Sequence, residues 1–220
     1  MFNLPLHQLQ ELHLLHFTLW SEELSSMLGR CQNLEACTLF VTKDYHSSTG
    51  GPPAFATAIP GVRSLTLYNA KNFDYDNSRK WAQAQFNALT SRSCFALRTL
   101  STSTHINNVD IESVLGEMPS LVELDVLEGE PISDSTLRLL CRGLLGPKLE
   151  VLKCAVEPGM LSDFLDMLDC RYVPKKSRAV YRGLRSVVIR CSKNTAGYTE
   201  VCERLQELKH SGRDVAVRYQ

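Results

Sequence analysis

The sequence predicts an α/β protein in which short parallel strands alternate with helices as a repeating, curved solenoid. Two observations lead to this prediction: one apolar frame recurs along the 220 residues, and the hydrophobic period between its copies is that of a helix. An internal repeat takes precedence over local assignments because it decides the whole architecture. We therefore expect one domain, 1–220, of about seven irregular repeats.

The recurring frame has the form apolar-x-x-apolar-x-apolar. Its last two apolar positions are two residues apart, so they point to the same side of an extended chain while the residue between them faces the opposite side. Each copy therefore predicts a short strand with one buried and one open face. The copies are Leu9/Leu12/Leu14, Leu34/Cys37/Leu39, Val62/Leu65/Leu67, Leu97/Leu100/Thr102, Leu121/Leu124/Val126, Leu149/Leu152/Cys154 and Leu184/Val187/Ile189.

The spacing between copies indicates the class of repeat. The first positions lie 25, 28, 35, 24, 28 and 35 residues apart, and most of these intervals fall in or near the roughly 20 to 29 residues of a leucine-rich repeat. Helical periodicity follows the frame, as in the apolar residues from Met160 to Leu168. We therefore expect a leucine-rich-repeat solenoid, or horseshoe, with a curved parallel sheet on the concave side and helices on the convex side.

Local start and stop signals support this alternation. Ser21 and Ser133 each precede acidic residues at the start of a helical stretch, where a hydroxyl can cap the helix and acids favour its positive end. Pro119 and Pro147 stand between a helical stretch and the next frame, where a helix must stop. Each repeat is therefore expected to run strand, loop, helix and return.

An ordinary doubly wound α/β domain is the alternative fold, because it also alternates strands and helices. Its strands would be buried on both faces and apolar throughout. The residue between the last two apolar positions of the frame faces away from them, and in this sequence it is often polar. One face of the sheet is therefore expected to be open to solvent. These polar residues are His13, Thr38, Thr66, Ser101, Asp125 and Lys153.

Two segments carry a resemblance to a known family. Cys31–Leu39 and Ile132–Cys141 resemble the cysteine-containing leucine-rich repeats of F-box proteins, and the irregular repeat lengths are similar to those of the large fungal group of F-box-like proteins. The resemblance implies the substrate-recognition region of a ubiquitin-ligase adaptor, which docks the small adaptor of a cullin ligase through an F-box. Because Leu4–Leu14 follows the repeat frame, no F-box is evident, and it would be missing or degenerate.

The overall charge of the chain limits which classes of binding partner can be expected. With 24 basic and 24 acidic residues, the net charge gives no reason to expect nucleic acid or an anionic membrane as the partner. No secretory signal is recognised, and the apolar runs are shorter than a membrane span. We expect a cytoplasmic or nuclear protein with no membrane span.

Charges nevertheless segregate along the chain. Residues 99–137 contain eight acids and no Lys or Arg, whereas 170–199 contain basic residues and no acid. The second segment is either a solvated loop or a patch that binds phosphorylated or other anionic ligands. The predicted basic patch comprises Arg171, Lys175, Lys176, Arg178, Arg182 and Arg185.

The open strand face is the candidate interaction surface. A shallow surface of parallel strands offers area rather than an enclosed pocket, so a protein partner or substrate suits it better than a small metabolite. The alternative is that these side chains are merely solvated. The predicted partner-binding residues are His13, Phe40, Thr66, Tyr68, Ser101, Glu123, Asp125, Lys153 and Arg190.

The motif content gives little support to catalysis or metal binding. The sequence contains no Gly-x-Ser-x-Gly, His-Glu-x-x-His or nucleotide-binding fingerprint, and its eight cysteines form no Cys-x-x-Cys. We predict no enzymatic activity, no cofactor and no metal, with Cys37 and Cys154 as small buried hydrophobes. The expected function is protein–protein interaction, and a free scaffold with no ligase role is the alternative to the F-box interpretation.

Overall fold

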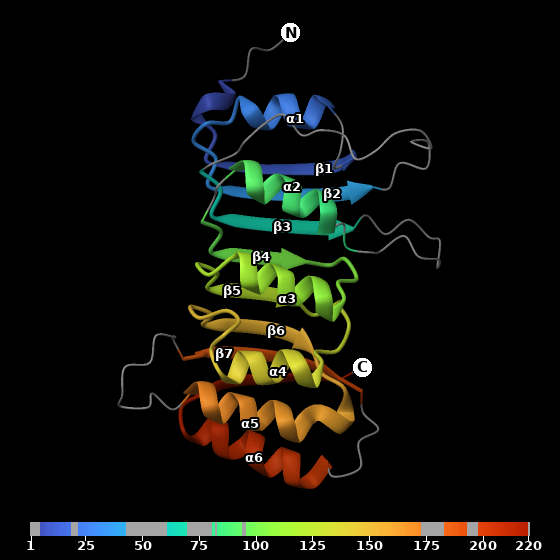
Figure 1. The fold of residues 1–220 in the computed structure, drawn as a ribbon, viewed down its shortest axis with the longest axis vertical. Helices are drawn as coiled ribbons and strands as arrows, with labels where there is room; N and C mark the ends of the chain where they lie inside the picture. Colours follow the sequence, from blue (N-terminus) through green and yellow to red (C-terminus); the bar gives the residue numbers. More distant parts are fainter. Residues whose placement is uncertain are drawn as a thin grey trace. The chain divides into compact units, whose positions relative to one another are not determined.

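The structure is a computed structural model that describes residues 5–18, 22–42, 61–69, 81, 83–93, 96–172, 183–192 and 198–219. The chain divides into two compact units, Met1–Thr104 and His105–Gln220. Both units combine parallel strands with helices (Figure 1). A described helix lies between most successive strands, but residues 43–60, between the second and third strands, lie outside the described residues. The prediction of an α/β protein with parallel strands is therefore confirmed at this level.

The strands of the first unit run parallel to one another and pair in sequence order. Their register aligns the copies of the apolar frame, because Cys37 lies beside Leu65, which lies beside Leu100. The described elements are η1 (Leu6–Gln8), β1 (Glu11–Thr18), α1 (Glu22–Gly29), β2 (Ala36–Thr42), β3 (Ser64–Asn69), α2 (Gln83–Ser93) and β4 (Thr99–Thr102).

The second unit follows the same plan, and its strands also pair in parallel and in sequence order. Its described helices lie on one side of its strands (Figure 1). The elements are α3 (Asn108–Glu117), β5 (Glu123–Val126), α4 (Asp134–Cys141), β6 (Val151–Ala155), η2 (Pro158–Met160), α5 (Leu161–Tyr172), β7 (Ser186–Cys191), α6 (Tyr198–His210) and β8 (Asp214–Tyr219).

Burial in the second unit alternates along the strands with a period of two residues. Leu124, Leu152 and Val187 are neighbours in the register, and each is 0% exposed. The helices contribute buried side chains such as Phe164 and Leu168 of α5 to the same core. The inside and outside positions of the frame are therefore as predicted in these strands.

The first unit buries its frame residues less uniformly. Cys37 and Leu65 are almost fully buried, as in the second unit. In β1, by contrast, Leu12 and Leu14 are only half-buried. The first copy of the frame thus forms the predicted strand but contributes less to the core.

Two helices of the second unit, α3 and α4, begin at side-chain caps. Ser133 Oγ accepts a hydrogen bond from the backbone N–H of Thr136 at 3.2 Å, which confirms the predicted cap of α4. Asn107 caps α3 in the same way. Helix α4 ends at Cys141, and Gly143, with φ of 70°, adopts a left-handed conformation that favours glycine soon after the helix end. The other predicted cap, Ser21, lies outside the described residues.

Strand β8 is an element that the frame did not predict. Val215 lies beside Val187 in the register, so the last two apolar positions of the frame recur at Val215 and Val217. Gly212 occupies the place of the first apolar residue, and its φ of 81° explains why a side chain is disfavoured there. The pattern was missed because a turn requirement replaced one of its three apolar positions.

Candidate interaction surface

The open face of the second unit presents rows of side chains, because register neighbours on parallel strands point to the same side. Glu123 and Asp214 lie at the amino ends of β5 and β8, Asp125 lies in the middle row, and arginines lie toward the carboxyl ends of β7 and β8. The amino-end row is Glu123, Val151, Ser186 and Asp214, the middle row is Asp125, Lys153, Val188 and Ala216, and the carboxyl-end row is Ala155, Arg190 and Arg218.

Lys153 of β6 lies between two acids of β5. Its Nζ donates to Glu123 Oε1 at 2.9 Å and is 3.2 Å from Asp125 Oδ2. The three side chains are 29%, 32% and 22% exposed, so the cluster is partly shielded from water. Burial by itself would lower the pKa of Lys153, but the hydrogen bond to Glu123 and the charges of both acids outweigh it and raise that pKa above its ordinary value. The lysine is therefore a fixed positive charge at neutral pH.

Arg190 of β7 is held by the loop that follows β5. Its Nη2 donates to the carbonyl oxygen of Gly129 at 3.1 Å, and its Nη1 is 4.0 Å from Glu128 Oε2. A Cβ atom at Gly129 would come within 2.8 Å of Ile106 Cγ2 and 3.1 Å of Val126 O, so the loop needs glycine there. The loop and the arginine thus fix each other at the carboxyl ends of the strands.

The amino-end row also contains a short polar contact. Ser186 Oγ donates to Asp214 Oδ2 at 2.6 Å, which links β7 to β8 on the open face. Asp214 remains exposed, as does Arg218 at the other end of β8. Neither residue of β8 was predicted, because the strand itself was not. The Val-x-Val spacing at Val215 and Val217 was the signal that could have found them.

The middle row of the first unit carries no acid and no Lys or Arg. His13, Thr38, Thr66 and Ser101 are successive register neighbours, as the frame predicts. The two threonines and the serine are half-buried, whereas His13 is exposed, with its Nε2 4.0 Å from Glu11 Oε2. This row offers hydroxyl groups rather than fixed charges.

The predicted aromatic positions of the first unit are neighbours in the register. Tyr68 of β3 lies beside Phe40 of β2. Tyr68 is 40% exposed, so its ring is accessible to a partner. The side chain of Phe40 lies outside the part of the chain that the structure describes.

The predicted basic patch is only partly within the described structure. Arg185 is exposed, and its Nε is 3.4 Å from Glu150 Oε2. Arg171 is 1% exposed and therefore cannot belong to a surface patch, which corrects the prediction for this residue. The remaining predicted members, Lys175, Lys176, Arg178 and Arg182, lie outside the described residues.

The burial of Arg171 has a clear physical cause. Its guanidinium donates to the carbonyl oxygens of Leu140 at 3.4 Å, Gly146 at 2.9 Å and Leu149 at 3.2 Å. These carbonyls belong to α4 and to the turn between α4 and β6, where the backbone acceptors of a helix end need donors. Arg171 therefore ties the end of one helix to the next helix and has a structural role.

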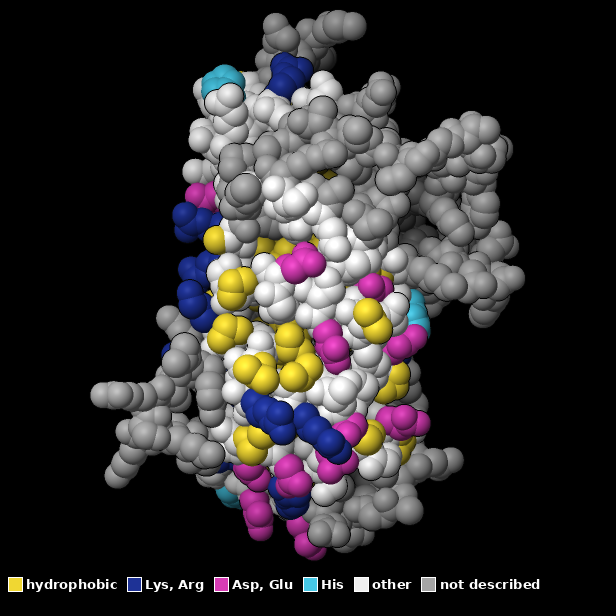
Figure 2. Space-filling view, in the orientation of Figure 1, with side chains coloured by type: hydrophobic (Ala, Val, Ile, Leu, Met, Phe, Trp, Pro, Cys, Tyr) yellow, Lys and Arg dark blue, Asp and Glu magenta, His cyan; other side chains and the backbone are white. Residues whose placement is uncertain are grey.

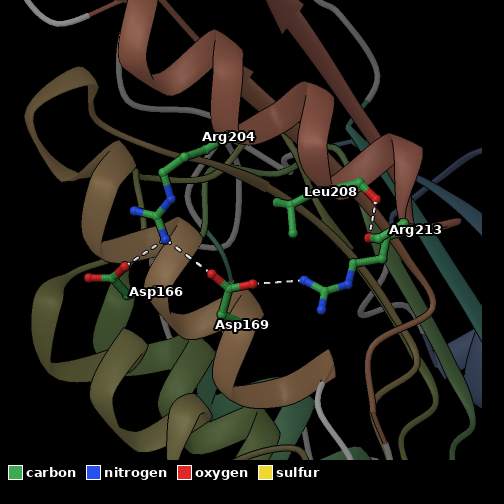
Figure 3. A network of polar contacts seen from close by, with 6 residues as sticks. Asp166, Asp169, Arg204, Leu208 and Arg213 are labelled. Atoms are coloured by element: carbon green, nitrogen blue, oxygen red, sulfur yellow. Dashed lines mark hydrogen bonds and ion pairs between the residues drawn. The ribbon is translucent and has the colours of Figure 1, made fainter.

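A second arginine network connects α5, α6 and the turn before β8 (Figure 3). Arg204 donates to Asp166 Oδ1 at 2.8 Å and to Asp169 Oδ2 at 3.1 Å. Arg213 donates to the other oxygen of Asp169 at 2.7 Å, and Ser211 donates to the carbonyl of Leu208. The network positions β8 against the helices.

One carboxyl of the acidic segment has a shifted pKa. The pKa of Asp110 is raised by burial, lowered by its hydrogen-bonded neighbour Asn107 and raised by the charge of Glu130, with a net rise. In the same segment, Glu112 accepts a hydrogen bond from Thr136 at 2.7 Å and from Ser135 at 3.2 Å. These contacts connect α3 to α4 and account for part of the acidic segment without a ligand.

The helix side of the second unit is a competing surface. In Figure 2, hydrophobic side chains gather over the region of α3 and α4, while basic and acidic side chains intermix over α5 and α6. Val109 of α3 is 75% exposed, and Leu144, after α4, is 64% exposed. Only two large apolar side chains of this unit are strongly exposed among the described residues, and a few such residues are ordinary on a protein surface, so we propose no site on this side.

Two cysteines occupy frame positions. Cys37 is 2% exposed and Cys154 is 0% exposed. Burial raises the pKa of the Cys37 thiol to about 12, with Cys31 as a smaller cause, and burial followed by the charge of Asp125 raises that of Cys154. Both thiols are protonated at neutral pH and pack as small hydrophobes. Among the described residues, no group of three or more His, Cys, Asp or Glu is placed to hold a metal ion.

Comparison of the chain with models of protein families, with curated proteins and with solved structures gives no match. The resemblance to F-box repeat regions therefore remains an expectation from the sequence. In the described part of the chain, no helix is long and apolar enough to cross a membrane.

Proposed function

We propose that this chain is a leucine-rich-repeat solenoid that binds a protein partner through the open face of its strands. The observation that carries the proposal is the Glu123–Lys153–Asp125 cluster on that face, with distances of 2.9 and 3.2 Å around the lysine. Side chains on paired strands have fixed positions, so this cluster can present a defined charge pattern at little cost in side-chain entropy.

The register supports the repeat architecture within this proposal. Leu124, Leu152 and Val187 occupy the same position of the frame and lie side by side, as stacked repeats require. Their neighbours on the open face vary in charge and size from strand to strand. A repeat protein of this kind keeps its core positions apolar and uses the alternate positions for recognition.

The resemblance to F-box repeat regions supports a narrower form of the proposal, in which the open face recognises a substrate of a cullin-type ubiquitin ligase. A free interaction scaffold without a ligase role is the alternative. Affinity capture of the intact gene product from its native cells, with mass spectrometry, separates the two. Recovery of the cullin adaptor supports the ligase role, and its absence beside reproducible other partners supports the scaffold.

The open face itself is tested with a matched pair of variants in the same capture experiment. Lys153→Met removes the central charge of the cluster, whereas Lys209→Met makes the same change at an exposed position of α6. We expect Lys153→Met to reduce recovery of the partner and Lys209→Met to leave it unchanged. Equal recovery with both variants would argue against binding through the open face.

The binding of phosphorylated or other anionic ligands by the basic segment is a separate hypothesis. Of the described members, Arg171 is buried and Arg185 is close to Glu150, so neither favours it. We therefore keep the open face as the proposed site.

A further inference from the structure

The outer edge of β8 is a surface that the proposed function does not use. β8 is the last strand in the order and pairs with β7 on one side. Within the described residues, no strand pairs with its other side. Such an edge presents backbone N–H and C=O groups that can pair with another strand. The side chains of β8 determine which strands can pair with this edge.

The side-chain sequence of β8 is complementary to itself. The strand contains the segment Asp214-Val215-Ala216-Val217-Arg218, with one acid and one base at equal distances from its central alanine. In an antiparallel pair centred on Ala216, Asp214 lies opposite Arg218 of a second copy. Val215 then lies opposite Val217 of the second copy on the other face. Opposite charges and β-branched pairs at such positions stabilise a sheet.

The exposure of these residues fits such a pairing. Asp214, Ala216 and Arg218 alternate along the open face, and all three are exposed. Val215 is 3% exposed, while Val217 is half-buried and has surface left to cover.

The charged side chains at the two ends of β8, Asp214 and Arg218, can still form new ion pairs. Asp214 accepts the hydrogen bond of Ser186 through Oδ2, which leaves Oδ1 for a second donor. Arg218 makes no hydrogen bond or ion pair with the other described residues. Each end of β8 can therefore form an ion pair with a second copy without losing a contact that the described residues make.

The same charges disfavour other partners. A parallel pair of two β8 strands in register would set Asp214 beside Asp214 and Arg218 beside Arg218, and like charges directly opposite destabilise a sheet. Charged side chains on edge strands also discourage pairing with unrelated strands. Only the antiparallel arrangement satisfies both charges of β8 at once.

We propose that the β8 edge is a homodimer interface in which two copies of this chain pair β8 with β8, antiparallel and centred on Ala216. Two Asp214–Arg218 ion pairs then cross the interface. The contact is the same on both copies, so it closes at two and does not propagate into a fibre. Both open faces lie on the same side of the joined strands, because paired residues of neighbouring strands share a face.

The experiment is a set of charge reversals followed by sedimentation or light scattering over a range of concentrations. The wild type is expected to approach twice the 24.7 kDa of one chain as concentration rises. Asp214→Arg and Arg218→Asp each place like charges across the interface twice and should weaken dimerisation about tenfold or more. The double variant D214R/R218D restores opposite charges and should dimerise like the wild type.

Mixing the two single variants gives a sharper result. One chain then carries two arginines at these positions and the other carries two aspartates, so the mixed dimer has opposite charges at both ends. Native mass spectrometry of a mixture, with one variant carrying a mass tag, should show the mixed dimer in excess over either homodimer. Circular dichroism of each variant checks that it is folded.

Asp163→Arg and Lys148→Asp are the matched controls, because both residues are exposed and lie outside β8. They should leave dimerisation unchanged. A wild type that stays monomeric up to its solubility limit, a dimer that survives the single reversals, or a double variant that does not recover would each overturn the proposal. Because Lys153→Met tests the open face independently, failure of the dimer does not decide the proposed function.

Discussion

The two faces of strands β5 to β7 differ in what their side chains can do. On the helix side, Leu124, Leu152 and Val187 are each 0% exposed and purely apolar. On the open side, Asp125 and Lys153 occupy neighbouring positions and are held in a partly shielded ion pair at 3.2 Å. Residues that are adjacent in the sequence therefore have unrelated roles.

This difference implies that the two faces of one short strand can be tested separately, the helix-side face for stability and the open face for the proposed binding. The apolar row determines whether the repeat folds, because its burial removes nonpolar surface from water. The open row buries little nonpolar surface, so its charges should contribute little to folding. Changes on one face should therefore alter stability, and changes on the other should alter binding.

The strongest test of this difference between the faces uses two variants at adjacent residues, one that places a charge on the buried face and one that places an apolar side chain on the open face. Leu124→Asp places an unpaired carboxylate on the buried face and should cost about 4 kcal/mol or more, enough to unfold the second unit. Asp125→Leu should change the free energy of unfolding by roughly 1 kcal/mol or less, because its site is partly open. Thermal and denaturant unfolding measure both. Similar losses from the two variants would mean that the assignment of the faces is wrong.

A second test extends the comparison to two arginines of the same basic segment. Arg171→Met removes donors from three backbone carbonyls and should destabilise the protein by about 3 kcal/mol. Arg185→Met, at a side chain that is 78% exposed, should have an effect within about 0.5 kcal/mol. The midpoints of denaturant unfolding compare the stabilities of the two variants, provided that both have the same dependence of free energy on denaturant concentration. Equal stabilities would show that the carbonyl contacts of Arg171 contribute nothing.

A smaller effect is expected from the network between α5 and α6. Asp169→Ala removes contacts to Arg204 and Arg213, but the aspartate is 48% exposed and water screens its charge. We expect a loss of about 1 kcal/mol that shrinks as salt is added. Unfolding at low and high ionic strength measures this loss. A loss that does not depend on salt would attribute the effect to packing instead.

The smallest effect on stability is expected at the open-face lysine. Lys153→Met should cost about 0.5 kcal/mol at neutral pH. The pKa of Lys153 is raised by folding, so the stabilisation is fully present below its ordinary value of 10.5 and is lost as pH rises through the folded value. The stabilities of wild type and variant should therefore converge above pH 10.5. A gap that widens there would reverse the assigned sign.

Much of the local structure could be predicted from the sequence because the apolar frame is short and periodic. Strands β1 to β7 form at its copies, and Ser133 caps α4 as its position predicts. Strand β8 could not be found from the same frame, because Gly212 stands where its first apolar residue belongs. The frame therefore missed a strand where a turn requires glycine at one of the three apolar positions.

Whether an individual charged residue is buried or exposed was harder to predict from the sequence. Arg171 and Arg185 occur in one basic segment without acids, yet one is buried and the other is exposed. Sequence distance does not reveal which backbone carbonyls lack donors, so the burial of Arg171 was not predictable. For the open face, the alternation predicted Lys153 and both of its acidic partners as surface residues, but not that they contact one another.

The sequence by itself determined which residues of each strand face inward, because side chains on an extended chain alternate with a fixed period of two. It also determined that strands alternate with helices, through the change of hydrophobic period between frames. Only the tertiary structure decided how Lys153 is paired, why Arg171 is buried and that β8 pairs with β7. These features depend on contacts between residues distant in sequence, and such contacts are set by the register of neighbouring strands and by which backbone groups still need a hydrogen-bond partner.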